Sequence, residues 1–401
     1  MSKKSPQLRF EGFTDDWEQR KLKDIVNRVT RKNKNLESTL PLTISAQYGL
    51  VDQITFFNKQ IASKDMSGYY LLQKGEFAYN KSYSKDFPWG AIKRLNMYDE
   101  GVLSTLYIAF LPFKVNSDFL VSYYETDGWH KEVAIRAAEG ARNHGLLNIT
   151  AVDFFDTGLM IPPNNDEQQE IGGFFIELDH TITLHQRKLD LLKEQKKGFL
   201  QKMFPKNGAK VPELRFAGFA DDWEERKLGD VFSERSERSS EGELISVTIN
   251  SGVVKASELD RKDNSSNDKS NYKKVEVGDI AYNSMRMWQG ASGYSSYDGI
   301  LSPAYTVIIP KEGTDSKFFA YDFKRHDMIQ TFKRNSQGLT SDTWNLKFPT
   351  LKSVKVMVPC MEEQTKISNF FERLDTTITL HRRKLDLLKE QKKGFLQKMF
   401  V

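Results

Sequence analysis

The sequence has a single cysteine and no long apolar run, and both shortages restrict the class of protein. With only Cys360 among 401 residues, an internal disulfide framework is excluded and a reducing compartment is expected. No apolar stretch approaches the ~20 residues that span a bilayer. The N-terminal residues 1–5 carry charge but precede no hydrophobic core of a secretion signal. We therefore expect a soluble, cytoplasmic protein that does not contact membranes.

A strong charge of one sign is missing too. Lys and Arg number 59 against 54 Asp and Glu, which leaves a net charge of +5. This balance permits nucleic-acid binding without requiring it, because the electrostatic footprint depends on where the charges lie.

Motifs that carry catalysis are also absent from the sequence. It contains neither a G-x-G-x-x-G dinucleotide motif after a strand nor a G-x-x-x-x-G-K-[ST] phosphate loop. Pro162-Pro163 is not followed by the aromatic residue that an adenine methyltransferase needs beside its target base. The six histidines show no close pairing with cysteine or carboxylates at metal-ligand spacing. We predict a chain that is not an enzyme, with no catalytic residues, no bound metal and no cofactor.

The main feature that is present is an internal repeat. Residues 8–24 recur at 214–230 with 13 of 17 positions identical, and residues 178–204 recur at 374–400 with 25 of 27 identical. The chain is therefore built as two halves, which meet near residues 205–211.

Between the repeated blocks the two halves diverge, but a skeleton of turns survives. Lys-Gly-Glu-Phe-Ala-Tyr-Asn at 74–80 corresponds to Val-Gly-Asp-Ile-Ala-Tyr-Asn at 277–283, and Pro163 and Pro359 each precede a Glu-Gln pair. We infer that one fold is used twice with most of its side chains changed. Such an arrangement suggests two recognition domains that bind two different targets.

The divergent segments alternate apolar and polar residues between Gly, Asn and Pro. Their β-branched and aromatic content predicts strands at 40–44, 106–110, 244–249 and 304–309. Residues 119–139 and 317–332 have helical patterns. We predict an α+β fold, in which two similar mixed α/β domains are related by a pseudo-dyad and separated by a pair of long antiparallel helices.

The two long helices are predicted from the repeated segments 178–204 and 374–400. In the first, His185 and Lys196 are the two polar positions of a coiled-coil-like seam whose apolar positions are 178, 182, 189, 192, 199 and 203. Since each helix alone would expose its apolar stripe, we predict that the two pack together and run antiparallel. The alternative is that each helix packs on its own domain.

The length of these helices suggests the distance that they hold between the two divergent segments. A helix of 27 residues is ~40 Å long at 1.5 Å per residue, and two readers on one face of a DNA duplex lie ~34–36 Å apart. The helices therefore have the length of a spacer between two DNA readers, and we predict a bipartite target with an unread gap.

The whole arrangement resembles the specificity subunit of type I restriction-modification enzymes. The resemblance rests on the doubled Trp17-Glu18…Lys21-Leu22 and Trp223-Glu224…Lys227-Leu228 openings, the Gly75 and Gly278 turns, the Pro…Glu-Gln segments and the two Leu-Asp…Ile…Leu helices. It covers essentially the whole chain, in the order variable segment, helix, variable segment, helix.

The resemblance implies a division of labour along the chain. Residues 1–177 and 207–373 would each be a target-recognition domain, and residues 178–206 and 374–401 the central and distal conserved helices. It implies a sequence-specific subunit that binds double-stranded DNA at an asymmetric bipartite target. Its partners would be two methylation subunits, with restriction subunits joining through the methylation complex, so that adenine methylation and cleavage reside on other chains.

Candidate DNA-binding residues lie on two loops in each half. Base reading needs Arg, Lys, Asn and Gln on positioned loops, and phosphate contacts need Lys, Arg and small hydroxyls. The candidates are Asn80, Lys81, Tyr83, Lys85, Arg142, Asn143 and His144 in the first half, and Asn283, Arg286, Trp288, Gln289, Lys333, Arg334, Asn335 and Gln337 in the second. For any single residue the alternative is an ordinary solvated loop.

Two other functions stay open at this point. A helical adaptor that scaffolds a protein complex without binding DNA would also use the paired helices. A free-standing nuclease or methyltransferase is disfavoured by the missing motifs. The near identity of the helices further suggests that recombination between their coding segments exchanges the recognition domains.

Overall fold

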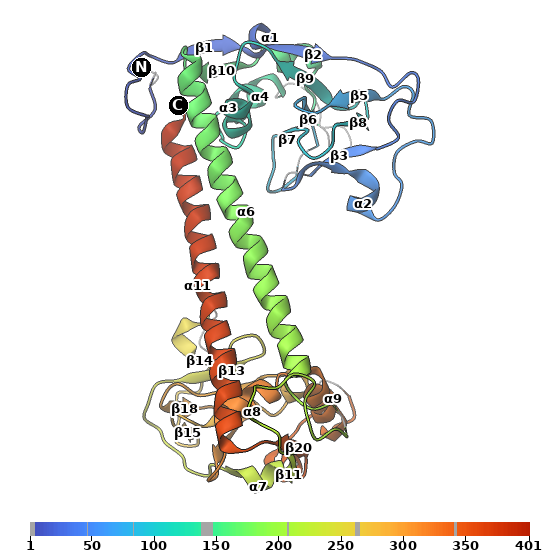
Figure 1. The fold of residues 1–401 in the computed structure, drawn as a ribbon. Coiled ribbons are helices and arrows are strands. Elements are labelled where there is room, and N and C mark those ends of the chain that lie inside the picture. Colours follow the sequence, from blue (N-terminus) through green and yellow to red (C-terminus); the bar gives the residue numbers. More distant parts are fainter. Residues whose placement is uncertain are drawn as a thin grey trace. The chain divides into compact units, whose positions relative to one another are not determined.

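A computed structural model describes residues 5–45, 47–82, 84–137, 147–206, 208–260, 265–340 and 343–401 (Figure 1). The chain divides into two compact units. Unit 1 comprises Met1–Gln186 and Arg383–Val401, and unit 2 comprises Arg187–Arg382. Each unit therefore contains one divergent segment and a part of both long helices.

Unit 1 is a mixed unit of short strands and helices. Its elements are β1 (Glu18–Lys21), α1 (Leu22–Ile25), β2 (Val26–Val29), β3 (Leu42–Ser45), β4 (Gly49–Asp52), α2 (Gln53–Phe57), β5 (Tyr70–Gln73), β6 (Phe77–Asn80), β7 (Ala91–Arg94), β8 (Glu100–Leu103), β9 (Ile108–Pro112), α3 (Ser117–Tyr123), α4 (His130–Ala137), α5 (Ala151–Phe155), β10 (Gly158–Ile161), the first part of α6 (Asn165–Lys202) and the last part of α11 (Met361–Met399).

Unit 2 repeats this order. Its elements are β11 (Glu224–Lys227), α7 (Leu228–Val231), β12 (Phe232–Glu234), β13 (Ile245–Thr248), β14 (Gly252–Lys255), η1 (Ala256–Glu258), β15 (Lys273–Val275), β16 (Ile280–Asn283), η2 (Met287–Gln289), β17 (Ser292–Tyr294), β18 (Gly299–Leu301), β19 (Tyr305–Pro310), α8 (Ser316–Asp322), α9 (His326–Asn335), α10 (Phe348–Leu351) and β20 (Lys355–Val358), with the remaining parts of α6 and α11.

A four-stranded antiparallel sheet lies at the centre of each unit. Its strand order is β2-β9-β6-β7 in unit 1 and β12-β19-β16-β17 in unit 2. Three two-stranded sheets accompany it in corresponding places, namely β1-β10, β3-β4 and β5-β8 in unit 1, and β11-β20, β13-β14 and β15-β18 in unit 2. The prediction that one fold is used twice is confirmed at the level of strand order.

The alternation of side chains along the central strands forms two cores in unit 1. On one face Phe77 stacks on Phe110 at 5.2 Å between ring centroids, and Tyr79 stacks on Phe154 of α5 at 4.6 Å. On the other face the small residues Ala78 and Ala109 are paired in register and pack into a second cluster. Because successive strand residues point to opposite faces, the segment Phe-Ala-Tyr serves both cores at once.

The four predicted strands are present as β3, β9, β13 and β19. The two predicted helices at 119–139 and 317–332 are wrong in their continuity, because each is divided into two, α3 with α4 and α8 with α9. In unit 1 the break is a turn at which the Thr126 hydroxyl donates to the Tyr123 carbonyl at 2.7 Å. This break contains Glu125-Thr126-Asp127-Gly128, a polar turn signal that the helical pattern of the flanking residues outweighed in the prediction.

The long helices begin earlier than their repeated sequence predicts. α6 starts at Asn165 instead of Leu178, and α11 at Met361 instead of Leu374. Ile171 and Phe175 continue the apolar stripe of α6 into the core of unit 1, where both are buried. The extension follows from packing on a domain whose own sequence is not repeated.

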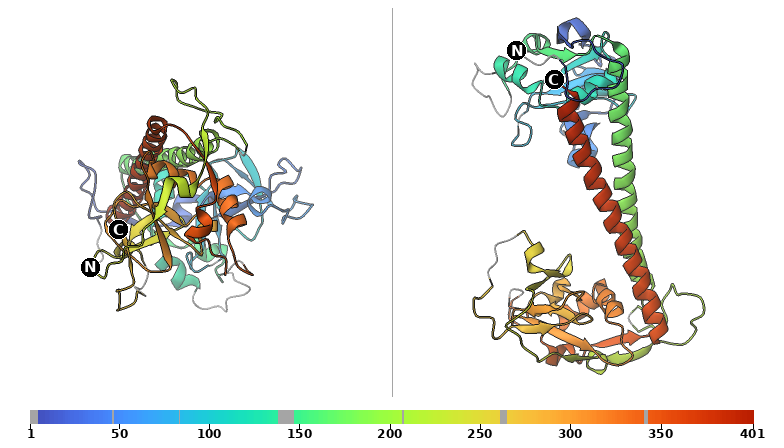
Figure 2. Two further views of the ribbon diagram at one scale, coloured as in Figure 1. Left: turned by 90° about the horizontal axis from the view of Figure 1, so that it is seen from below. Right: turned by 90° about the vertical axis from the view of Figure 1, so that its left-hand side faces the viewer.

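Within each unit the two long helices lie side by side and run antiparallel, as predicted (Figure 2). In unit 1 the Phe174 and Phe395 rings are 5.1 Å apart, and Lys392 bonds to Asp179 further along α6 at 2.6 Å. In unit 2 Phe199 and Phe370 are 5.0 Å apart. There the predicted seam residue Lys196 binds Asp375 at 2.5 Å, which explains a lysine in an otherwise apolar stripe.

A buried Glu-Gln pair fastens the start of each long helix. Glu167 has no solvent exposure and accepts hydrogen bonds from Arg9 at 2.6 and 2.8 Å and from the Trp17 indole at 3.3 Å. Gln168 accepts from the Asn116 amide at 2.8 Å and donates to the Pro162 carbonyl at 2.8 Å. These bonds join the opening segment, the turn before α3 and α6 at one point.

Unit 2 repeats the same attachment. Glu363 is fully buried and binds Arg215 through both carboxylate oxygens at 2.8 Å. Gln364 accepts from the Asp315 amide at 3.0 Å and donates to the Pro359 carbonyl at 2.9 Å. The Glu-Gln motif is therefore structural. In the described part of the chain, no helix is apolar over the length needed to cross a membrane.

Two adjacent glycines of α6 provide a test of the packing in unit 1. A Cβ added at Gly172 would lie 2.6 Å from the Phe119 nitrogen and 2.7 Å from the Asp118 carbonyl carbon, whereas at Gly173 nothing lies within 4 Å. We expect Gly172→Ala to lower the free energy of unfolding by ~1–3 kcal/mol because the backbone of α3 must move. Gly173→Ala should raise it by ~0.5–1 kcal/mol through helix propensity. Urea denaturation of both variants measures this, and equal effects would contradict the close packing of α6 on α3.

Candidate nucleic-acid interface

The first predicted loop of unit 2 is held in a compact turn after β16. The Asn283 side chain accepts from the Met285 amide at 3.0 Å, and its carbonyl accepts from the Arg286 amide at 2.9 Å. The turn then forms η2 and ends at Gly290, whose φ of +84° favours glycine. Asn283, Arg286, Trp288 and Gln289 are therefore presented from one short, hydrogen-bonded segment.

The second predicted loop of unit 2 closes onto the first. It leaves the end of α9, and Gln337 and Asn345 exchange backbone hydrogen bonds of 3.0 and 2.8 Å across it. The Leu346 amide then donates to the Ser284 carbonyl at 2.9 Å. The structure thus brings together two loops that are about 50 residues apart in sequence.

Two tryptophans and a lysine form a corner where these loops meet. The Trp288 and Trp344 rings are 5.2 Å apart in an edge-on arrangement, and the Trp288 indole donates to the Met285 carbonyl at 3.1 Å. The Lys333 ammonium lies 5.6 Å from the centre of the Trp344 ring. Sequence reasoning missed Trp344. The signal that could have found it is an aromatic residue within the polar loop that follows Lys333.

Asn283 and Arg286 line a groove in unit 2 with a volume of about 930 Å³. The groove is bordered by β13, η1 and the turn between β18 and β19, and its lining includes Leu244, Ile245, Ser246, Ser257, Ser266, Asn271, Tyr272, Ser302 and Tyr305. Glu243 and Asp268 also line it. Hydrogen-bond donors and acceptors, among them an arginine, therefore line a concave surface that can bind the polar edge of a polymer.

The other predicted residues of unit 2 lie at the end of α9. Lys333, Arg334 and Gln337 are exposed. The Arg334 guanidinium donates to the Thr331 hydroxyl at 3.0 Å, and the Asn335 side chain donates to the Thr331 carbonyl at 2.9 Å. Asn335 is thus engaged with its own helix, whereas Lys333 and Gln337 present their polar groups to solvent.

Unit 1 closes its loops by the same contact. The Asn80 side chain accepts from the Ser82 amide at 3.0 Å, and the Leu147 amide donates to the Lys81 carbonyl at 2.9 Å, as Leu346 does to Ser284. The Lys81 ammonium also donates to the Ile149 carbonyl at 3.4 Å, and Lys85 is exposed. Four predicted residues lie outside the described residues, namely Tyr83, Arg142, Asn143 and His144.

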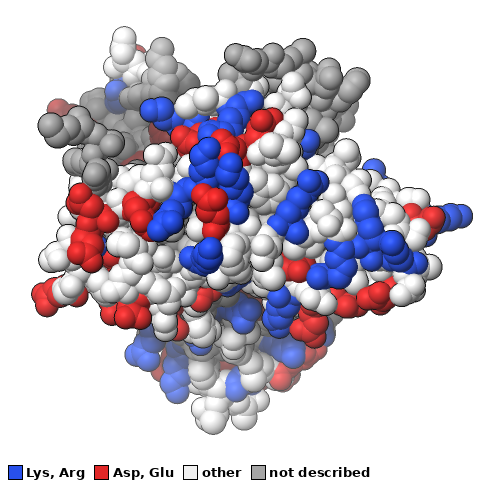
Figure 3. All heavy atoms as spheres, turned by 90° about the horizontal axis from the view of Figure 1, so that it is seen from above, with Lys and Arg blue, Asp and Glu red and all other residues white. Residues whose placement is uncertain are grey.

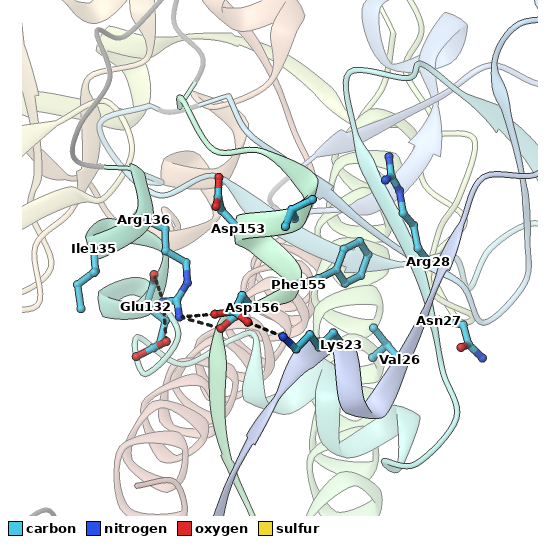
Figure 4. A pocket seen from close by; sticks show the side chains of 11 residues that line it. Lys23, Val26, Asn27, Arg28, Glu132, Ile135, Arg136, Asp153, Phe155 and Asp156 are labelled. Carbon is cyan, nitrogen blue, oxygen red and sulfur yellow. Dashed lines mark hydrogen bonds and ion pairs between the residues drawn. The ribbon is translucent and has the colours of Figure 1, made fainter.

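A second hollow, of about 910 Å³, lies in unit 1 between α1, β2, α4 and α5 (Figure 4). Asp156 binds Lys21 and Lys23 there at 2.8 Å each, and these hydrogen bonds hold the pKa of its carboxyl well below the usual value. Arg136 donates to the Asp156 carbonyl at 2.7 Å. Arg28 points away from this cluster. Most of the cations in the hollow are thus paired.

Lys and Arg side chains gather on the face of unit 1 that carries β1, α1 and β2 (Figure 3). Acidic side chains are interspersed among them, consistent with the ion pairs of Asp156. Within the described ranges, no group of three or more His, Cys, Asp and Glu side chains could hold a metal ion.

Comparisons with known proteins find a matching family model and similar solved structures. Residues 220–390 match the family model of the type I restriction modification DNA specificity domain. The S subunit of a type I restriction-modification system from M. genitalium is 14% identical over 99% of both chains, with a TM-score of 0.59. The HsdS subunit from Thermoanaerobacter tengcongensis is 15% identical over 96% of both chains, with a TM-score of 0.44.

The family match covers most of unit 2, and unit 1 repeats the sequence blocks and the strand order of unit 2. The fold is that of the M. genitalium subunit. Residues 220–390 thus match the DNA specificity domain of type I restriction modification, in agreement with the resemblance found in the sequence.

The loop that carries Gln337 depends on Gly338. This residue has a φ of +148°, and an added Cβ would lie 2.6 Å from the Thr343 carbonyl oxygen. We expect Gly338→Ala to open the loop, so that the amides of Gln337 and Asn345 exchange hydrogen at least ~10-fold faster. Hydrogen exchange measured by mass spectrometry checks this. Gly313→Ala is the control, since its φ is +76° but nothing lies within 4 Å; faster exchange of the same amides in that variant would argue against the steric explanation.

Proposed function

We propose that each unit reads one half of an asymmetric, bipartite DNA target. The observation that carries this proposal is that both units close two loops through the same backbone contact, Leu147 to Lys81 and Leu346 to Ser284. The scaffold is shared, but the side chains that it presents differ, with Lys81 in one unit where the other has Ser284. Two different half-sites are the expected consequence.

The groove of unit 2 has the chemistry for reading base edges. An arginine can make two hydrogen bonds to the O6 and N7 atoms of guanine, and an asparagine can bind the N6 and N7 atoms of adenine. Arg286 and Asn283 line the groove and supply these groups. The exposed Lys333, at the end of α9, suits a phosphate contact, which fixes the register on the duplex.

We further propose that the chain itself is not an enzyme. Methylation of adenine and ATP-dependent cleavage would be carried out by partner chains, two methylation subunits and the restriction subunits that join them. Exposed leucines support two equivalent docking surfaces. Leu184 and Leu191 on α6, and Leu380 and Leu387 on α11, are 52, 52, 59 and 51% exposed. They recur at the same places of the repeat and are seven residues apart, so each pair shares a helix face.

An adaptor that binds no DNA is the rival function. The first experiment co-expresses the chain with the methylation subunit from the same host and maps methylated adenines by long-read sequencing. A single asymmetric, gapped motif supports the proposal and identifies both half-sites. A stable complex without any motif would favour the adaptor.

Arg286 provides a test at the level of one residue. Arg286→Ala removes a bidentate donor from the groove of unit 2, so we expect a loss of ~1–3 kcal/mol in discrimination at the second half-site only. Arg334→Ala should likewise act only on the second half-site. Methylation of substrates that carry single-base changes in either half-site measures this.

The matched control lies in unit 1. Lys81→Ala should alter recognition of the first half-site and leave the second unchanged. If Arg286→Ala or Arg334→Ala weakened binding equally on all sequences, the residue would contact phosphate and would not read a base.

The two long helices carry a prediction about the gap. A seven-residue insertion preserves the seam and adds ~10 Å to a helix, which corresponds to ~3 base pairs of DNA. Inserting seven residues after Gln186 and seven after Arg382 should therefore widen the unread gap by ~3 base pairs. The methylated motif of the lengthened chain gives the answer directly, and an unchanged gap would refute the spacer hypothesis.

A further inference from the structure

Lys324 is a half-buried lysine of unit 2 whose ammonium binds two backbone carbonyls from different loops. It follows α8 directly and donates to the Gly290 carbonyl at 2.5 Å and to the Ile249 carbonyl at 2.9 Å. Hydrogen bonds from a charged donor are about twice as strong as those between neutral groups. The side chain therefore joins two segments that no strand pairing connects at this point.

Both carbonyls belong to segments that shape the candidate reading groove. Gly290 ends the turn that carries Arg286 and Trp288. Ile249 follows β13, whose first residues Ile245 and Ser246 line the groove with Arg286. Lys324 itself does not line that groove, so its influence on the groove passes through the backbone of these two segments.

On its other side Lys324 faces the long helices, within unit 2. It lines a cavity of about 290 Å³ together with Lys196 of α6 and Asp375 of α11. Lys196 binds Asp375 at 2.5 Å, and the Tyr321 hydroxyl donates to the same carboxylate at 3.0 Å. Burial, and secondly the charge of Lys196, lower the pKa of Lys324 to about 8.

The corresponding position of unit 1 is different. By the alignment of α3 with α8, Glu125 takes the place of Lys324, and its carboxylate binds Lys392 of α11 at 2.5 Å. Lys392 is the repeat equivalent of Lys196. The repeated helix lysine therefore binds a carboxylate in unit 1. In unit 2 it shares a cavity with a second lysine, Lys324, whose ammonium donates to the loop carbonyls.

We propose that Lys324 is a positioning residue for DNA recognition by unit 2, which holds the 283–290 segment against the β13–β14 hairpin so that Arg286 faces the groove. This proposal rests on the proposed function and deepens it. Lys324 acts through the backbone of Gly290 and does not contact DNA. Its loss should therefore relax the choice of bases at the second half-site and leave the first half-site unaffected.

The test compares three variants in complex with the methylation subunit. Lys324→Met removes the donors, Lys324→Arg keeps them, and Lys311→Met removes an ammonium that donates to another carbonyl of unit 2, that of Gly229 at 2.6 Å. The readout is the methylation rate on the intact target divided by that on single-base variants of each half-site. We expect Lys324→Met to lower this ratio ~10-fold at the second half-site, Lys324→Arg to restore most of it, and Lys311→Met to leave it unchanged.

The pH profile separates positioning from mere stability. Between pH 7 and 9 the Lys324 ammonium loses its proton and the bonds to both carbonyls weaken, so the second half-site ratio of the wild type should fall. Lys324→Arg, which stays charged, should show a flat profile. The other charged or titratable groups that line the cavity are Lys196, Lys317, Tyr294, Tyr321, Glu372 and Asp375. Among them Tyr321 has a raised pKa, as has Lys317, so neither loses its proton in this range.

Each outcome decides between the hypotheses. Equal losses at both half-sites, or an unchanged ratio in a folded Lys324→Met chain, would overturn the role of Lys324. If Lys324→Met fails to fold, the Lys324→Arg profile decides alone, and a profile that falls as steeply as that of the wild type would overturn the proposal. A wild-type complex that methylates no gapped motif would instead contradict the proposed function.

Discussion

The fold of both units depends on a carboxylate that has no access to water. Glu167 and Glu363 are each fully buried, and each is paired with one arginine, Arg9 or Arg215, from the opening segment of its unit. A buried charge that loses its partner costs about 3–5 kcal/mol. The opening segment and the start of a long helix are therefore obliged to meet in the same way in each unit, whatever lies between them in the sequence.

The glutamine that follows each buried glutamate attaches a further segment to the start of the long helix. Gln168 and Gln364 accept hydrogen bonds from the backbone just before α3 and α8. Each of these short helices is therefore fixed to the start of the long helix in its own unit. These few contacts use side chains that recur in both halves. The loops that close onto Lys81 and Ser284 use backbone groups, so the contact itself does not require particular side chains in the loops. The loop residues are consequently free to differ between the units while the frame stays constant.

Much of this could be predicted from the sequence because repetition reveals which residues belong to the frame. The seam position of Lys196 was predicted from spacing alone, and its partner Asp375 lies in the repeated helix. The early start of α6 could not be predicted from the repeat, because Ile171 and Phe175 pack on a divergent core. The breaks between α3 and α4 and between α8 and α9 were missed because each is short and is flanked by helical patterns on both sides.

The candidate loops could be located in the sequence where a turn signal marked them, whereas residues that only folding brings to these loops could not. The segments at 283–289 and 333–337 were both found from their Asn, Arg and Gly content, and they meet in the structure. Trp344 and Lys324 were not found. Trp344 reaches Trp288 only after the second loop folds back, and Lys324 acts on a carbonyl that carries no sequence signal.

The central claim is that one frame presents two independent readers. The most direct measurement replaces residues 1–177 by residues 207–373, so that both positions of the chain carry the domain of unit 2, and maps the adenines that the resulting complex methylates. The account predicts a symmetric, gapped target in which the second half-site occurs twice in inverted orientation. A complex that assembles normally but still methylates the original asymmetric target would contradict it.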